Sequence, residues 1–332
     1  MSRTPAGGAA VGTTPAGSGG GASPVPFGAR LAGAMDAHGP LCVGIDPHAT
    51  LLQAWGLEDS AAGVREFSLR VVDALGGQVA AFKPQAAFYE RHGSAGVAAL
   101  EDTLAAARAA GTLTIVDAKR GDIGSTMSAY ADAFLRDGSP LAGDALTVSP
   151  YLGFGSLEPA VNLAEATGRG LFVLCLTSNK EGPEVQHART GATPPTMTGD
   201  GVTPAPSGAS SDTPPSATPP SATVAAVVAA HAAAVNAGAA PMGSVGLVVG
   251  ATIGDAVTST GTDLDAVNGP LLAPGVGAQG AGEKELATTF GRARGRVLAS
   301  SSRGILRAGP APHDLRAAAR QAAEDATRAL RG

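Results

Sequence analysis

The stretch GVAALEDTLAAARAAGTLTIVDAK (96–119) joins a segment typical of a helix to a segment typical of a strand. Residues 96–111 are rich in Ala, Leu, Arg and Glu, which favour helices. Residues 113–119 begin with an apolar run, as in a strand that is buried on both faces of a parallel sheet. Helix and strand in alternation indicate parallel strands connected by crossover helices.

Seven further strand-like runs are distributed along the chain. Their starts are usually about 26 to 38 residues apart, which leaves room for a helix between neighbouring strands. With residues 113–119 they form eight strand–helix units and predict an α/β protein with a single-domain (β/α)8 TIM barrel. A doubly wound sheet is the alternative, because periodicity cannot show whether a sheet closes. The seven runs cover residues 41–46, 79–85, 145–150, 171–177, 245–252, 271–277 and 297–305.

One spacing departs from this pattern, because the starts of the fifth and sixth runs are separated by roughly twice the largest of the other spacings. The extra residues, 187–223, are dominated by Pro, Thr, Ser, Gly and Ala. Such a composition cannot bury enough apolar surface to offset the entropy of ordering. It predicts a disordered low-complexity insertion between strands 5 and 6. By the same reasoning residues 1–25 are a disordered tail, and the barrel domain spans 26–332.

Composition excludes several classes of function. The 332 residues are 44% hydrophobic, enough for a substantial core, and carry a net charge of −5 with no block of like charge. Binding to nucleic acid or to an anionic membrane is therefore not expected, and no apolar stretch approaches a membrane span. Cys42 and Cys175 lie in apolar runs, which predicts buried reduced thiols in a cytoplasmic protein.

Charge is scarce in this chain, at 15% of residues, yet four charges fall within residues 117–122. Asp117 and Lys119 share one face of the strand, and Asp122 follows after the strand has ended. Alternating acid and base would keep the lysine protonated and would direct it toward a bound molecule. The alternative is a salt-bridge cluster that joins strand to helix.

Further polar residues stand at the carboxyl ends of the other predicted strands, where TIM barrels carry their chemistry. Two of them have simpler interpretations, since Asp46 suits an Asx-turn or helix cap and Lys83 suits a snorkelling lysine. The residues at these ends are Asp46, Lys83, Asp117, Lys119, Asp122, Thr177, Ser178, Gln279 and Arg303.

The segment GVGAQG (275–280) matches the dinucleotide fingerprint, but it lies near the C-terminus instead of in a first βαβ unit. A nicotinamide cofactor is therefore rejected. Its glycines instead favour a phosphate site, with Arg303 of the SSSRG segment (300–304) closing on the same group. An ordinary strand-to-helix turn is the alternative for SSSRG. The six histidines show no metal-ligand spacing, so no metal site is predicted.

The sequence resembles the orotidine 5′-phosphate decarboxylase family, in its longer bacterial branch (type 2). The segment IVDAKRGDIGST (115–126) is similar to the family signature D-x-K-x-x-D-I-x-x-T. The resemblance covers roughly residues 40 to 310 outside the insertion. Other matching segments are FKPQAAFYERHG (82–93), TVSPYLG (147–153), LTSN (176–179), APGVGAQG (273–280) and SSSRGI (300–305).

This resemblance implies decarboxylation of orotidine 5′-phosphate to UMP and CO2 in pyrimidine biosynthesis, without a cofactor or metal. Four residues carry the family's Lys–Asp–Lys–Asp array. Lys119 is then the proton donor to C6 of the pyrimidine, and Asp117 lies against the departing carboxylate. Lys83 holds ribose hydroxyls, and Asp122 reaches into the site of a partner subunit in a homodimer.

The resemblance also implies the residues that bind the rest of the substrate. Asp46 joins Lys83 at the ribose, and Thr126 crosses the dimer interface together with Asp122. Thr177 or Ser178 meets the pyrimidine edge, and the residues alone do not decide between them. The phosphate falls to Gln279 and Arg303, with the adjoining Gly304.

Two alternatives remain open at this point. One is a Mg²⁺-dependent sugar-phosphate decarboxylase or synthase of the same superfamily, but those relatives carry an acidic metal ligand where this chain has Lys83. The other is a non-catalytic barrel that binds a phosphorylated metabolite. The presence of all four charged residues of the array favours an enzyme.

Overall fold

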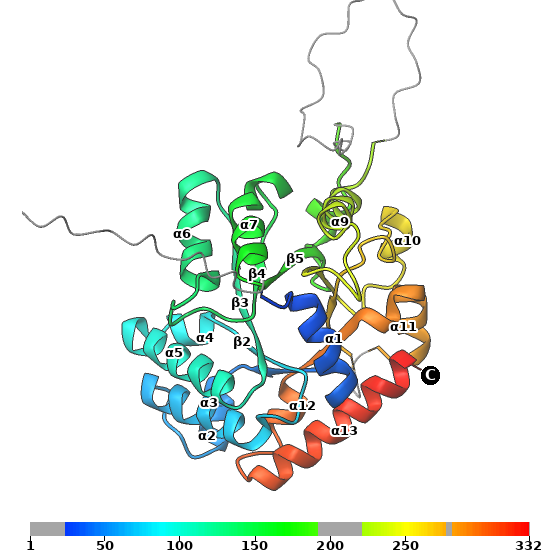
Figure 1. Cartoon of the computed structure of the whole chain (residues 1–332). Coiled ribbons are helices and arrows are strands. Elements are labelled where there is room, and N and C mark those ends of the chain that lie inside the picture. The colour runs from blue at the N-terminus through cyan, green and yellow to red at the C-terminus, as the bar shows by residue number, and fades with distance from the viewer. Residues whose placement is uncertain (1–23, 192–220, 277–280, 332) are drawn as a thin grey trace, which may run out of the picture.

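A closed barrel of eight parallel strands forms the centre of the molecule (Figure 1). The computed structural model describes residues 24–191, 221–276 and 281–331. The strands pair in chain order, and β8 pairs with β1. The predicted (β/α)8 barrel is confirmed, and the open doubly wound sheet is wrong. The strands are β1 (Leu41–Ile45), β2 (Ala81–Pro84), β3 (Leu113–Arg120), β4 (Ala145–Val148), β5 (Gly170–Leu176), β6 (Val245–Val249), β7 (Leu271–Pro274) and β8 (Val297–Ser301).

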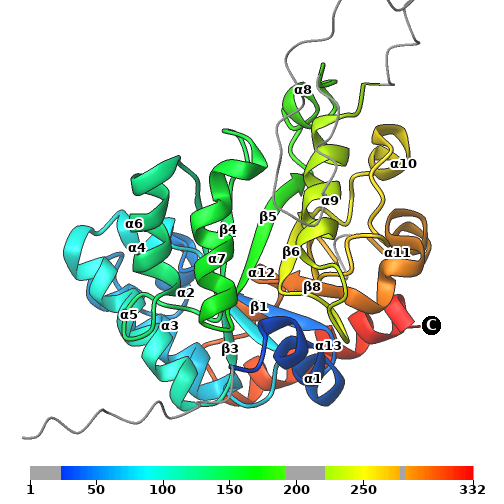
Figure 2. The same cartoon turned by 45° about the horizontal axis from the view of Figure 1, so that its top comes forward.

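Helices connect successive strands and cover the outside of the barrel (Figures 1 and 2). None of the described helices is both long enough and apolar enough to cross a membrane. The described helices are α1 (Phe27–His38), α2 (Ala49–Ala54), α3 (Ala61–Leu75), α4 (Ala87–Glu90), α5 (Gly93–Ala109), α6 (Gly124–Leu135), η1 (Phe154–Leu157), α7 (Glu158–Ala166), α8 (Pro183–Gln186), α9 (Val224–Val235), α10 (Ala256–Thr260), α11 (Glu283–Phe290), η2 (Gly291–Arg296), α12 (Arg303–Leu306) and α13 (Pro312–Arg331).

Side chains from all of the strands fill the barrel interior, and α1 closes its lower end. Phe27, Leu31 and Met35 of α1 belong to the same apolar cluster as these interior side chains. The Phe27 ring meets Phe172 edge to face at 6.0 Å between centroids. Figures 1 and 2 show α1 lying across the end of the barrel, apart from the outer helices. The interior side chains are Cys42, Ala81, Ile115, Ala145, Phe172, Val248, Leu272 and Leu298.

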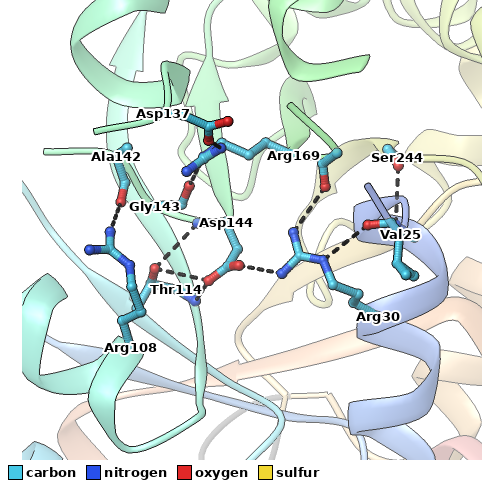
Figure 3. Close-up of polar contacts among 12 residues, drawn as sticks. Val25, Arg30, Arg108, Thr114, Asp137, Ala142, Gly143, Asp144, Arg169 and Ser244 are labelled. Atoms are coloured by element: carbon cyan, nitrogen blue, oxygen red, sulfur yellow. Dashed lines mark hydrogen bonds and ion pairs between the residues drawn. The ribbon is translucent and has the colours of Figure 1, made fainter. Parts of the chain in front are cut away.

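Polar contacts fasten α1 to the amino ends of the strands. Arg30 forms an ion pair with Asp144, directly before β4, and donates to the Gly168 carbonyl at 2.9 Å (Figure 3). The other Asp144 oxygen accepts the Thr114 backbone N–H at 2.9 Å. The Gly28 amide donates to the Ser244 hydroxyl, ahead of β6, at 3.1 Å. The lower end of the barrel is therefore closed, and the upper end, where the strands finish, is left for a site.

The two segments predicted to be disordered lie largely outside the described residues. Their described margins make defined contacts. The Thr190 amide donates to the Ala222 carbonyl at 2.8 Å, and Arg189 pairs with Thr223 as an antiparallel bridge. Thr223 also caps α9, because its hydroxyl accepts the Ala226 amide at 3.2 Å. The predicted boundaries of the insertion, 187 and 223, fall within these described margins.

Candidate active site

Asp117 is the centre of a charged cluster at the upper end of the barrel. Its Oδ2 accepts from Lys83 Nζ of β2 at 2.7 Å and from Gln85 Nε2 at 3.2 Å. Its Oδ1 accepts from Lys119 Nζ at 2.5 Å and from the Thr147 hydroxyl at 2.9 Å. Strands β2, β3 and β4 thus bring a carboxylate, two ammonium groups and a hydroxyl together.

The environment of Asp117 keeps it ionised. Burial alone would raise the pKa of this carboxyl, but the Lys83 and Lys119 ammoniums outweigh burial and lower the pKa to about 2. Burial would likewise lower the pKa of Lys83, yet the Asp117 and Asp46 carboxylates raise it above its ordinary value. Both partners therefore remain charged at neutral pH. Lys83 is buried, whereas the Lys119 side chain is 44% exposed, so Lys119 is the ammonium open to a bound molecule.

Lys119 occupies an unusual backbone conformation. Its φ is +47°, in the left-handed region that residues other than glycine seldom adopt. The pairing of β3 with β4 is interrupted here, since its register shifts between Val116 and Arg120. The Lys119 amide donates to the Thr147 hydroxyl at 2.9 Å. At this irregularity the Lys119 ammonium contacts the Asp117 carboxylate of the same strand.

A cavity of about 130 Å³ lies against this cluster. Thr177 and Ser178, after β5, line it together with the two lysines, and apolar residues complete the wall. Thr177 is held by other groups, because its amide donates to Gln186 Oε1 at 2.9 Å and its hydroxyl accepts from Gln186 Nε2 at 2.6 Å. Ser178 is exposed. The cavity walls are Lys83, Asp117, Lys119, Thr147, Leu174, Thr177, Ser178, Val248, Gly250, Leu272 and Pro274.

The remaining predicted residues that the structure describes do not line this cavity. Asp46 follows β1, and its Oδ1 is buried with no hydrogen-bond partner among the described residues. Arg303 and Gly304 are exposed at the start of α12, after β8. Gln279 lies outside the described residues, so the predicted phosphate site is described only at Arg303 and Gly304.

Asp122 and Thr126 do not line the cavity of their own chain. Asp122 Oδ1 accepts the Ile123 amide at 2.8 Å. Thr126 is exposed on α6. The predicted Lys–Asp–Lys–Asp array is therefore assembled within one chain for Lys83, Asp117 and Lys119, but not for Asp122.

Two features of the described chain bear on other kinds of site. A wider cleft of about 620 Å³ lies between the end of α1, the end of α3 and α13, and none of the predicted residues lines it. We assign the chemistry to the smaller cavity, because it contains the buried charges. Within the described ranges, no three His, Cys, Asp or Glu side chains are grouped so that they could hold a metal ion.

Comparison with known proteins identifies the family of this chain. Residues 39–198 match the model of the orotidine 5′-phosphate decarboxylase / HUMPS family. The orotidine 5′-phosphate decarboxylase of Streptomyces coelicolor is 54% identical over 294 residues, which are 89% of this chain and 94% of that protein. This chain belongs to the orotidine 5′-phosphate decarboxylase family. The enzyme of Salinispora arenicola is 52% identical over 92% of this chain and 99% of its own length.

Solved decarboxylase structures agree with the fold. The crystal structure of a candidate orotidine 5′-phosphate decarboxylase from Streptomyces avermitilis is 56% identical, with a TM-score of 0.80 over 94% of this chain and 98% of that one. Leishmania donovani OMP decarboxylase is 29% identical, with a TM-score of 0.64 over 93% and 100% of the two chains. The predicted resemblance to the decarboxylase family is confirmed.

Sequence reasoning missed three residues that hold this decarboxylase site together. Thr147 and Gln85 contact Asp117, and Gln186 holds Thr177. Gln85 stood inside the quoted FKPQ segment, directly after a predicted strand-end lysine. Thr147 stood at the start of the quoted TVSPYLG segment, as one polar residue in an apolar strand. Gln186 carried no signal.

Proposed function

We propose that this chain decarboxylates orotidine 5′-phosphate to UMP and CO2. The observation that carries the proposal is the buried Asp117 carboxylate held between two ammonium groups, 2.7 Å from Lys83 Nζ and 2.5 Å from Lys119 Nζ. Such a cluster suits a reaction in which a carbanion forms and is protonated. The relatives at 54% and 52% identity bear the name of this activity.

In the proposed reaction, the bond between C6 and the carboxylate breaks, and its electron pair stays on C6 while CO2 leaves. The Lys119 ammonium stabilises this developing charge and then transfers a proton to C6, which gives UMP. Lys119, now neutral, takes a proton from solvent, to which its side chain is 44% exposed. The proposed steps use groups of the substrate and the chain, together with one proton from solvent.

Asp117 has two roles in this proposal. Its carboxylate aims the Lys119 ammonium through the 2.5 Å contact between Lys119 Nζ and Asp117 Oδ1. Because its pKa is lowered to about 2, it is also a fixed negative charge beside the substrate carboxylate. Departure of neutral CO2 relieves the repulsion between these two carboxylates.

The rest of the substrate is assigned to residues around the cavity. Ser178 is the better candidate for the pyrimidine edge, because the Thr177 amide and hydroxyl are already bonded to Gln186. Asp46, with a buried oxygen that lacks a partner in the described chain, and Lys83 are assigned to ribose hydroxyls. The phosphate is assigned to Arg303 and Gly304, and also to Gln279, which lies outside the described residues.

We further propose a homodimer whose two sites each borrow Asp122 and Thr126 from the partner subunit. The β3–α6 and β4–η1 segments lie side by side, because the Ser149 amide donates to the Arg120 carbonyl at 2.8 Å. They present exposed apolar side chains next to Asp122: Ile123 at 62%, Tyr151 at 77% and Leu152 at 53%. A surface of this kind suits burial against a second copy of the chain.

The proposal also includes the cellular compartment. Cys42 and Cys175 are both free and buried, and burial raises the pKa of each thiol to about 12. Two unreactive, unpaired thiols suit a reducing compartment, so we assign the enzyme to the cytoplasm.

The test is to mix purified protein with orotidine 5′-phosphate and to follow the loss of its absorbance together with CO2 release. We expect turnover, and we expect EDTA to leave it unchanged. Dependence on Mg²⁺ would favour the metal-dependent sugar-phosphate enzymes, although the Lys83 ammonium stands where they carry an acidic ligand. Binding of UMP without CO2 release would favour the non-catalytic barrel.

A further inference from the structure

Thr147 of β4 contacts both ends of the Asp117–Lys119 pair through one hydroxyl group. Its Oγ1 accepts the Lys119 amide at 2.9 Å and donates to Asp117 Oδ1 at 2.9 Å. The directions follow from chemistry, because an amide only donates and an ionised carboxylate only accepts. Thr147 is 1% exposed, so no solvent molecule replaces these bonds without a change in packing.

The backbone of Lys119 needs such an anchor. Its φ of +47° is disfavoured for a residue with a side chain, and such a conformation persists only where neighbouring groups hold it. The strand ladder does not do so, since the register between β3 and β4 shifts from Val116 to Arg120 around this residue. Thr147 is the β4 residue between Leu146 and Val148, which pair with Val116 and Arg120. The Thr147 hydroxyl therefore accepts the Lys119 amide hydrogen bond in place of a backbone carbonyl of the interrupted β3–β4 ladder.

We propose that Thr147 is a positioning residue that sets the direction of the Lys119 ammonium. This inference rests on the proposed decarboxylation, in which Lys119 delivers the proton. A hydroxyl that holds the Lys119 backbone and the Asp117 carboxylate together fixes the lysine stem at both of its ends. Its loss misaligns the proton donor but leaves the surfaces that bind phosphate and ribose intact.

The experiment compares the turnover of Thr147→Val and Thr147→Ser with that of wild type. The valine variant keeps the shape and loses the hydroxyl, and we expect kcat to fall by about 10- to 100-fold, the effect of one hydrogen bond to a charged group. KM should stay within about threefold. The serine variant keeps the hydroxyl and should recover kcat to within about threefold of wild type.

A matched control removes a hydroxyl elsewhere. Thr103 on α5 is also 1% exposed, and its hydroxyl donates to the Ala99 carbonyl at 2.7 Å. Thr103→Val should lower stability but leave kcat unchanged. If Thr147→Val does not fold, Thr147→Ala and Thr147→Ser give the same comparison without the branched side chain.

Hydrogen exchange at the Lys119 amide tests the anchor independently of activity. We expect exchange to be at least about tenfold faster in Thr147→Val than in wild type, and to be restored by serine. Unchanged exchange, or a kcat for Thr147→Val equal to that of wild type, overturns the inference. A serine variant as slow as the valine variant also overturns it, because packing of the methyl group would then be the cause. A wild-type protein without decarboxylation overturns the proposed function instead, while the exchange result still decides the anchor.

Discussion

The Asp117 carboxylate is kept ionised by the neighbouring Lys83 and Lys119 ammonium groups, and it in turn compensates their positive charge. Its side chain is only 8% exposed, and a lone carboxylate at such depth would take up a proton. The two ammonium groups prevent this, so that the pKa falls to about 2. Removing either lysine leaves the buried Asp117 carboxylate poorly compensated. Substitution of any one of the three charged residues should therefore destabilise the cluster.

Acid should therefore reduce stability through Asp117. Because the folded pKa of about 2 lies below the ordinary 3.8, folding favours the carboxylate. The stabilisation is complete above pH 3.8 and is lost as the pH falls through about 2. We expect the free energy of unfolding of wild type to drop by about 2 kcal/mol more than that of Asp117→Asn between pH 5 and pH 2. Denaturant titrations measure it, with Asp102→Asn as an exposed control. Equal slopes for wild type and Asp117→Asn would refute the assignment.

Lys119→Ala is the sharpest test of the proton donor. We expect decarboxylation to fall by at least about 10⁴-fold, because the variant loses both the general acid and the cation that stabilises C6. Folding and UMP binding should persist, which circular dichroism and calorimetry check. Lys284→Ala removes the same charge from the exposed surface of α11 and should leave turnover unchanged. Activity within tenfold of wild type would exclude Lys119 as the donor.

At the scale of residues, the sequence predicted the charged members of the site better than the neutral ones. Asp117 and Lys119 stood out because charged residues at the end of an apolar strand indicate a functional site or a salt bridge. Thr147 could not be predicted, since its role depends on the register shift between β3 and β4. No periodicity in the sequence records that shift.

At the scale of elements, the margins of the insertion define which residues can be removed. Deleting 192–220 and joining Gly191 to Ser221 through two glycines should preserve turnover and melting temperature. The reason is that Thr190 and Ala222 already hold the two margins together. Deleting the full 187–223 should cost about 1 to 2 kcal/mol, because it removes the Thr223 cap of α9. Thermal unfolding and the absorbance assay measure both variants. Loss of turnover in the folded short deletion would show that the insertion shapes the pyrimidine site.

The strands were easier to predict than α1. Buried parallel strands are recognisable from apolar runs alone, and each predicted run overlaps a strand of the barrel. Helix α1 escaped prediction because it precedes the repeating units and packs against the barrel interior instead of beside a neighbouring strand. The pattern of one segment does not reveal which distant surface it covers.

At the scale of the whole molecule, the shared site can be tested by mixing subunits. Lys119→Ala and Asp122→Ala should each be inactive as homodimers. In a heterodimer one site collects both lesions, while the other has intact Lys119 and intact Asp122. Random exchange should therefore restore about a quarter of wild-type activity, from one good site in half of the dimers.

A control pair separates this outcome from simple stabilisation on mixing. Lys83 and Lys119 contact the same Asp117 within one chain. Mixing Lys83→Ala with Lys119→Ala should therefore restore nothing, since every site keeps one lesion. If Lys119→Ala mixed with Asp122→Ala also restores nothing, Asp122 serves its own subunit. An active monomer in sedimentation would contradict the shared site directly.

The lower closure of the barrel also has a consequence for biosynthesis. Helix α1 leaves the ribosome before any strand, yet Arg30 bonds to Asp144 and Gly168, and Gly28 bonds to Ser244. Gly28 and Ser244 are separated by 216 residues, so α1 cannot complete its contacts until the segment ahead of β6 has been translated. During that interval the nascent chain exposes Phe27, Leu31 and Met35 to water or to a chaperone. Helix α1, which precedes all eight strands in the chain, thus completes its docking only after five of them have been made.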